Sequence, residues 1–139
     1  MSIVIPRNTF GICAFRDAAR VATLAAQDDL DRTGGAAVYF DYDSGRRYAV
    51  GYTGFEIPNY RHDTTTFFAL FQAGAALAQA LVYAEGFGFW IDQGTLYIDA
   101  FRTFADVKTA LAFAEANDQL AIYDRTAETS IFLTSRKAA

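Results

Sequence analysis

The sequence predicts one α+β domain in which an antiparallel sheet of about six strands carries three helices on one face. Two observations support this: helical and strand-like periodicities alternate along the chain, and turn residues divide the strands into pairs. The length of 139 residues suits a single domain. The order is helix then hairpin, three times, in tandem units of about residues 8–53, 62–99 and 100–134. Whether these units share ancestry stays open.

The first unit follows a short β-like run over Ser2–Ile5 and begins with a helix over about Phe15–Leu30, whose apolar residues recur at helical spacing. Several aspartates lie near the C-terminal end of this helix, where the helix dipole disfavours negative charge. We therefore expect the helix to stop early, before Gly34-Gly35. Alternating residues around Gly45 then predict a hairpin. Its strands are Ala37–Asp43 and Arg46–Tyr52, and Gly54–Arg61 is expected to form a loop.

The second unit opens with a helix over about Thr65–Ala84 that is apolar on almost every side, a pattern typical of a buried helix. Asp63 or Thr64 is the expected N-cap, because a short side-chain oxygen can accept from the free backbone N–H groups. A hairpin turning at Gln93-Gly94 follows. Its strands are Phe87–Asp92 and Thr95–Asp99.

The third unit contains a helix over about Phe104–Ala116. Thr103 and Asp106 have the spacing of a capping box at its start, and Asn117 suits a left-handed residue at its end. The last hairpin pairs Leu120–Asp124 with Thr129–Leu133.

Composition narrows the class of protein. Hydrophobic residues make up 53% of the chain and charged residues 20%, which excludes a disordered tail. The start of the chain lacks the pattern of a signal peptide, and no apolar run reaches the length of a membrane-spanning helix. A single cysteine excludes an intrachain disulfide and fits a cytoplasmic location. The net charge of −4 disfavours a nucleic-acid partner.

Catalytic and metal-binding motifs are weak. Cys13 and His62 are the ingredients of a cysteine–histidine site, but their neighbours indicate a small buried residue and a loop before a helix cap. Asp41–Gly45 resembles part of a calcium loop, yet its glycine is misplaced and no matching glutamate follows. We expect no cofactor and no metal, and we interpret the chain as a non-enzyme without excluding an enzyme.

Strand alternation gathers aromatic and acidic side chains on the sheet face opposite the helices. An aromatic patch on a soluble protein often marks an interaction site. The alternative is that these aromatics form a second core or pack across strands. Stacking of single-stranded bases is a third reading, which the aspartates oppose by repelling phosphates. The expected surface comprises Tyr39, Asp41, Arg47, Trp90, Asp92, Tyr97, Asp99, Tyr123 and Phe132.

The leading functional hypothesis is a non-catalytic protein-binding module that uses this aromatic and acidic face. Short acidic domains without motifs include stoichiometric inhibitors and adaptors, among them those of mobile elements, so we expect such a role. The partner is another protein, a second copy of the chain in a homo-oligomer, or both. Two alternatives stay open: a small enzyme whose site is assembled from scattered Asp, Arg and Tyr residues, and a structural subunit of a larger assembly.

Overall fold

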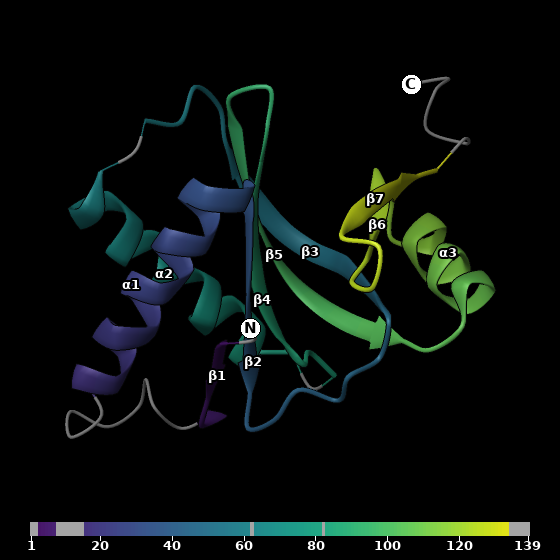
Figure 1. Cartoon of the computed structure of the whole chain (residues 1–139), viewed down its shortest axis with the longest axis horizontal. Helices are drawn as coiled ribbons and strands as arrows, with labels where there is room; N and C mark the ends of the chain where they lie inside the picture. The colour runs from purple at the N-terminus through teal and green to yellow at the C-terminus, as the bar shows by residue number, and fades with distance from the viewer. Residues whose placement is uncertain (1–2, 8–15, 62, 82, 134–139) are drawn as a thin grey trace.

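The computed structural model describes residues 3–7, 16–61, 63–81 and 83–133. It confirms the α+β class, with three helices and a mostly antiparallel sheet of seven strands within these ranges (Figure 1). The sheet has the order β1-β2-β4-β5-β3-β6-β7, and β1 pairs with β2 in parallel at one edge. The elements are β1 (Ile3–Ile5), α1 (Arg16–Thr33), β2 (Gly35–Phe40), β3 (Tyr48–Ile57), α2 (Thr64–Gln79), β4 (Gly86–Asp92), β5 (Thr95–Phe104), α3 (Val107–Ala116), β6 (Ala121–Asp124) and β7 (Thr129–Phe132).

The first helix ends before Gly34-Gly35, as predicted, but at Thr33 instead of at about Leu30. Arg32 forms ion pairs with Asp28 and Asp29, which lie about one helical turn before it. The acidic charge near the helix end is therefore compensated locally. Gly34, at φ +83°, donates its N–H to the Leu30 carbonyl oxygen at 2.8 Å and closes the helix.

Helix α2 begins as predicted, with Asp63 as the N-cap; its Oδ1 accepts from the Thr65 N–H at 2.8 Å. The helix ends at Gln79, earlier than the predicted Ala84. The reason is that Glu85 already takes part in the sheet. Its carbonyl oxygen accepts from the Phe40 N–H at 2.9 Å, so the preceding residues must turn toward β4.

The predicted start of the third helix is also wrong. Strand β5 continues to Phe104, so Thr103 is a buried strand residue and cannot form a capping box. Asp106 alone caps α3, accepting from the Thr109 N–H at 2.9 Å. After the helix, the left-handed residue is Asp118, at φ 55°, instead of Asn117.

The first predicted hairpin is wrong. Strand β2 pairs with β1 and β4, whereas β3 pairs with β5 and β6, so the β4–β5 hairpin lies between them. Residues 41–47 form a loop, in which the Asp43 carboxylate accepts from the Gly45 N–H at 2.8 Å. Strand β3 also continues to Ile57, through residues expected to form a loop, and its register shifts between Gly51 and Thr53. The second and third hairpins are confirmed.

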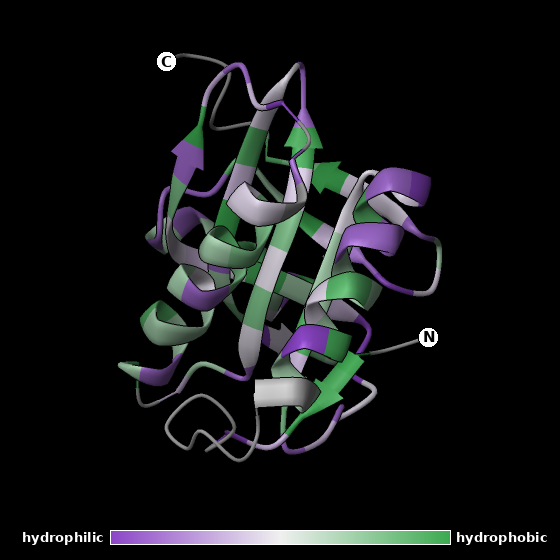
Figure 2. Ribbon diagram, turned by 90° about the vertical axis from the view of Figure 1, so that its left-hand side faces the viewer, coloured by the Kyte–Doolittle hydropathy of each residue, from purple (hydrophilic) through white to green (hydrophobic). Residues whose placement is uncertain are grey.

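Two hydrophobic cores hold the helices on the sheet. The larger packs α1 and α2 on β2, β4 and β5, and its centre includes Phe71, Phe87 and Ile98. Figure 2 looks onto α1 and α2 with the sheet behind them, and α1 carries bands of hydrophilic residues. The smaller core packs α3 on β3 and β6 around Val50 and Ile122.

The alternation of side chains along β5 shows that both cores lie on one face of the sheet. Leu96, Ile98 and Ala100 of β5 belong to the larger core, and Phe104 packs against the smaller one. Alternate residues of a strand share a face, so the helices cover a single face. The long strands β3 and β5 curve strongly, and α3 therefore stands on the other side of the molecule from α1 and α2 (Figure 1).

Candidate functional site

The outer face is the side of the sheet turned away from the helices. Its centre is a block of three strands, β4, β5 and β3, with paired residues in three rows. Paired residues of antiparallel strands share a face, so each row places three residues next to one another on this face. The rows are Gly86–Phe101–Gly51, Gly88–Asp99–Gly54 and Trp90–Tyr97–Glu56.

Glycines flank Asp99 on both neighbouring strands and bring no side chains of their own beside it. A Cβ atom added at Gly54 would lie 2.2 Å from Asp99 Oδ1 and 2.1 Å from the Ile98 carbonyl oxygen. A Cβ atom at Gly51 would lie 3.0 Å from the Asp99 Cβ. The Asp99 side chain therefore lies against the backbone of β3. We call Gly51, Gly54 and Gly88 the glycine floor.

Asp99 is half-buried on this floor. Burial first, and the Glu56 carboxylate second, raise the pKa of Asp99 to about 7. Within the described ranges, no hydrogen bond or ion pair reaches the Asp99 carboxylate. An acid in this position has no donor to stabilise its charged form, so about half of the molecules carry the proton near neutral pH.

An aromatic pair stands in the next row. The rings of Trp90 and Tyr97 are 5.1 Å apart between centroids and tilted by 36°. Both side chains are half-buried, and Glu56 opposite Tyr97 is exposed. Strand alternation predicted the positions of Trp90, Tyr97 and Asp99, whereas Glu56 lay in a segment expected to be a loop. We call Glu56, Trp90, Tyr97 and Asp99 the outer patch.

Tyr39 is not a surface residue, contrary to the expectation. Only 2% of it is exposed, and its ring meets Phe101 edge to face with 4.9 Å between centroids. The Arg125 guanidinium covers the ring at 4.9 Å. Burial raises the pKa of the Tyr39 phenol. The alternative of a second core therefore holds for this part of the outer face.

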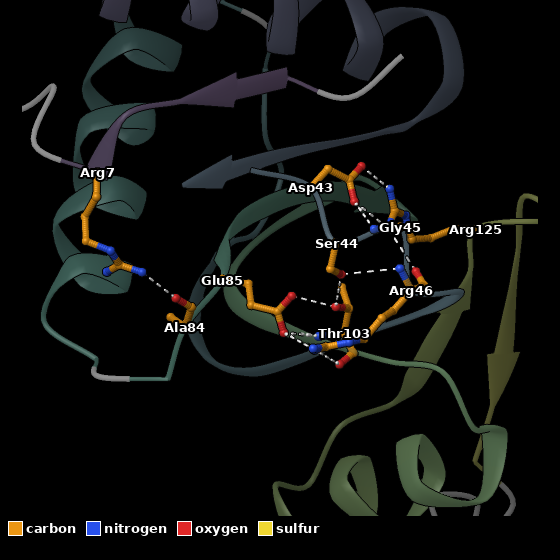
Figure 3. A network of polar contacts seen from close by, with 9 residues as sticks. All are labelled: Arg7, Asp43, Ser44, Gly45, Arg46, Ala84, Glu85, Thr103 and Arg125. Atoms are coloured by element: carbon orange, nitrogen blue, oxygen red, sulfur yellow. Dashed lines mark hydrogen bonds and ion pairs between the residues drawn. The ribbon is translucent and has the colours of Figure 1, made fainter. Parts of the chain in front are cut away.

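A polar network ties the loop of residues 41–47 to the sheet (Figure 3). The Glu85 carboxylate accepts from the Thr103 N–H at 2.8 Å and from its hydroxyl at 2.5 Å. Ser44 Oγ lies 3.0 Å from Thr103 Oγ1, and Arg46 Nη1 lies 3.5 Å from Glu85 Oε2. These contacts make the network a structural clamp between the loop and β5.

Arg125 completes the clamp from the turn between β6 and β7. Its guanidinium binds both carboxylate oxygens of Asp43, and its Nη1 donates to the Arg46 carbonyl oxygen at 2.9 Å. The sequence did not indicate this contact, since Asp43 and Arg125 lie 82 positions apart. The only signal available was their opposite charge.

Two further residues of the expected surface are engaged elsewhere. Asp41 lies after β2 and accepts from the Arg7 backbone N–H at 2.9 Å. Arg47 donates to Asp124 from Nε at 2.9 Å and from Nη2 at 2.8 Å. These bonds lower the pKa of Asp124 to about 2. Both pairs attach loops to the sheet.

The remaining residues of that surface lie apart from the outer patch or at its margin. Asp92 is half-buried at the end of β4, next to the hairpin turn. Tyr123 and Phe132 are 42% and 60% exposed on β6 and β7. They alternate with Ile122 and Ile131, which face α3. The nine expected residues therefore do not form one surface: Trp90, Tyr97 and Asp99 lie in the outer patch with Asp92 at its margin, Tyr39 is buried, Asp41 and Arg47 attach loops, and Tyr123 and Phe132 are a peripheral aromatic pair.

Other kinds of site receive no support. Across the described ranges, no group of three or more His, Cys, Asp and Glu side chains could hold a metal ion. Cys13 and His62 lie outside the described residues. The helices of the described chain are all too short or too polar to cross a membrane.

Comparison with protein-family models, with curated proteins and with solved structures finds no match to this chain.

Proposed function

We propose that this protein is a non-catalytic protein-binding module that docks a partner on the outer patch, in the manner of a stoichiometric inhibitor or adaptor. The observation that carries the proposal is the tilted Trp90–Tyr97 pair, partly exposed beside a carboxylate without a bonding partner among the described residues. Tryptophan and tyrosine dominate the binding energy of many interfaces. A single cysteine in the chain fits action in a reducing cytoplasm.

The enzyme alternative has one specific observation in its favour. The pKa of Asp99, about 7, suits a general base at neutral pH. However, the neighbouring residues in its row and the next are glycines, Trp90, Tyr97 and Glu56, so these described neighbours include no cationic group to stabilise a developing negative charge. We therefore favour binding over catalysis.

Photocrosslinking in the native host tests where a partner docks. The photoreactive residue p-benzoylphenylalanine replaces Thr95, which precedes Tyr97 by two positions on the same face of β5. The matched control carries it in place of Tyr83, which is 72% exposed outside the outer face, next to Arg102. We expect a discrete adduct from position 95 only. Equal adducts from both positions would contradict a specific docking face.

The captured partner then allows a binding measurement. Trp90→Ala and Tyr97→Ala should each weaken its binding by about 30-fold or more, as loss of an aromatic anchor does, whereas Tyr83→Ala should not. Isothermal titration calorimetry gives the three dissociation constants. If the two patch variants bind the partner like the wild type, the outer patch is not the docking site.

Sedimentation velocity tests whether that partner is a second copy of this chain. Concentration-dependent dimers that disappear in Trp90→Ala would identify self-docking on the patch. Dimers that persist in Trp90→Ala but disappear in Phe132→Ala would place the interface on the peripheral aromatic pair and contradict the proposal.

A further inference from the structure

Resting on the proposed function, we infer that the outer patch recognises a lysine or arginine side chain of the partner, which lies across the glycine floor with its charge against Asp99. The partner surface is therefore basic at its centre. The shape of the floor, the vacant bonding capacity of the carboxylate and the charge around it support this inference.

The glycine floor differs on the two sides of Asp99. The Asp99 carboxylate itself lies over Gly51 and Gly54 on β3, whereas Gly88 on β4 brings no side chain of its own beside the acid. A methyl group at Gly54 would collide with the Asp99 carboxylate, so the present geometry depends on glycine there. We therefore place the extended alkyl chain on the Gly88 side of the acid, where its stem can contact the neighbouring rings.

The carboxylate has unused acceptor capacity. Other carboxylates shielded by the fold are occupied: Glu85 by Thr103, and Asp124 by a two-bonded contact with Arg47. Asp99 receives no comparable donor from the described residues. An ionised carboxylate without hydrogen bonds is costly when removed from water, so a cationic donor supplied from outside stabilises it strongly.

The charge around Asp99 favours a cation. Strand β3 contributes Glu56, strand β4 contributes Gly88 and the uncharged Trp90, and β5 itself contributes Tyr97. The two aromatic faces also attract a cation through their π electrons. A phosphate or an acidic partner would meet two carboxylates here and would be repelled.

A bound cation must also displace the proton of Asp99. Since burial and Glu56 hold the pKa of this acid at about 7, the group is largely ionised at pH 8 and largely protonated at pH 5.5. Binding of a cation should therefore be at least tenfold stronger at pH 8 than at pH 5.5.

Amide chemical shifts measured during titration with small cations test the inference on the whole protein. The probes are N-acetyl-lysine methylamide and N-acetyl-arginine methylamide, and the uncharged N-acetyl-norleucine methylamide is the control of similar shape. At pH 8 we expect both cationic probes to shift the amide signals of Gly54 and Gly88 and the Trp90 indole signal. Equal shifts with the norleucine probe would overturn the inference.

Two isosteric variants test whether the carboxylate of Asp99 binds the cationic probes. Asp99→Asn should weaken binding of both cationic probes at least tenfold, and Asp92→Asn, which removes a half-buried acid at the margin of the same face, should leave it unchanged. Unchanged signals from α1 and α2 confirm that each variant is folded. Wild-type binding by Asp99→Asn would refute a role for this carboxylate.

Binding of the captured partner to these variants distinguishes failure of this inference from failure of the proposed function. If Trp90→Ala abolishes partner binding while Asp99→Asn leaves it intact, the docking face stands and the basic side chain is refuted. If Trp90→Ala and Tyr97→Ala leave partner binding intact, the proposed function itself fails. Loss of partner binding in all three variants supports both.

Discussion

Removing the charge of Asp99 should stabilise the protein at neutral and alkaline pH. The variant Asp99→Asn keeps the shape of the side chain and eliminates its ionisation. The fold raises the pKa of Asp99 from 3.8 to about 7, roughly three units. At about 1.4 kcal/mol per unit, the full shift corresponds to about 4 kcal/mol. Because the side chain is only half-buried and solvent screens part of its charge, we expect the variant to gain about 2–3 kcal/mol.

The direction of the pH dependence follows from proton binding. Between about pH 4 and pH 7 the unfolded chain has released the proton of Asp99 while the folded protein still holds it. The unfolded state therefore binds fewer protons in this window, and the contribution of Asp99 to the free energy of unfolding falls as the pH rises. Above pH 7 the loss is complete. The asparagine variant lacks this decline, so the two proteins should be similar near pH 4 and differ most at pH 8.

Urea denaturation followed by circular dichroism at several pH values between 4 and 8 measures this difference. The control is Asp92→Asn, which removes an acid from the margin of the same face. A constant difference between Asp99→Asn and the wild type across this range would refute the argument. So would an asparagine variant that is less stable than the wild type at pH 8.

Three further substitutions test the packing and the ion pairs. Gly74→Ala places a Cβ 2.9 Å from a Phe87 ring carbon. Overpacking should destabilise the protein by about 1–3 kcal/mol and outweigh a gain of about 1 kcal/mol in helix propensity, so the melting temperature should fall. A higher melting temperature would contradict this. Gly86→Ala directs a Cβ to 1.9 Å from a backbone carbonyl oxygen of β2. The free energy of unfolding in urea should fall by about 3 kcal/mol. An unchanged midpoint of urea denaturation would show that β2 and β4 can move apart to admit the methyl group. Asp124→Asn removes the negative charge and one of the two acceptor oxygens that Arg47 binds, and these bonds lower the pKa of Asp124 to about 2. The stability deficit should be full above pH 4 and disappear as the pH falls toward 2. A deficit independent of pH in urea titrations would exclude the ionic contribution.

Local patterns predicted the parts of the fold whose causes are local. Asp63 caps its helix because its own side chain reaches the next N–H groups. Gln93 and Gly94 form the second hairpin turn with positive φ values of 51° and 81°. Alternation along β4 and β5 placed Trp90, Tyr97 and Asp99 on one face, because neighbouring side chains of a strand point in opposite directions.

The long-range features of the candidate site escaped prediction. Tyr39 lies on the expected face, yet Arg125 from the far end of the chain covers it. Glu56 joins the outer patch because β3 extends along β5 through a segment that looked like a loop. Composition and periodicity carry no information about which distant segment lies against a given side chain.

By itself, the sequence determined the α+β class, three helices, two of the hairpins and the face on which most strand residues lie, since these depend on side-chain spacing and turn residues. Only the tertiary structure decided that β2 and β3 are separated by the β4–β5 hairpin. Alternation assigns a residue to a face but names no neighbouring strand. The neighbours follow from backbone pairing and core packing over the whole chain, and those contacts bring Gly54, Gly88 and Asp99 together.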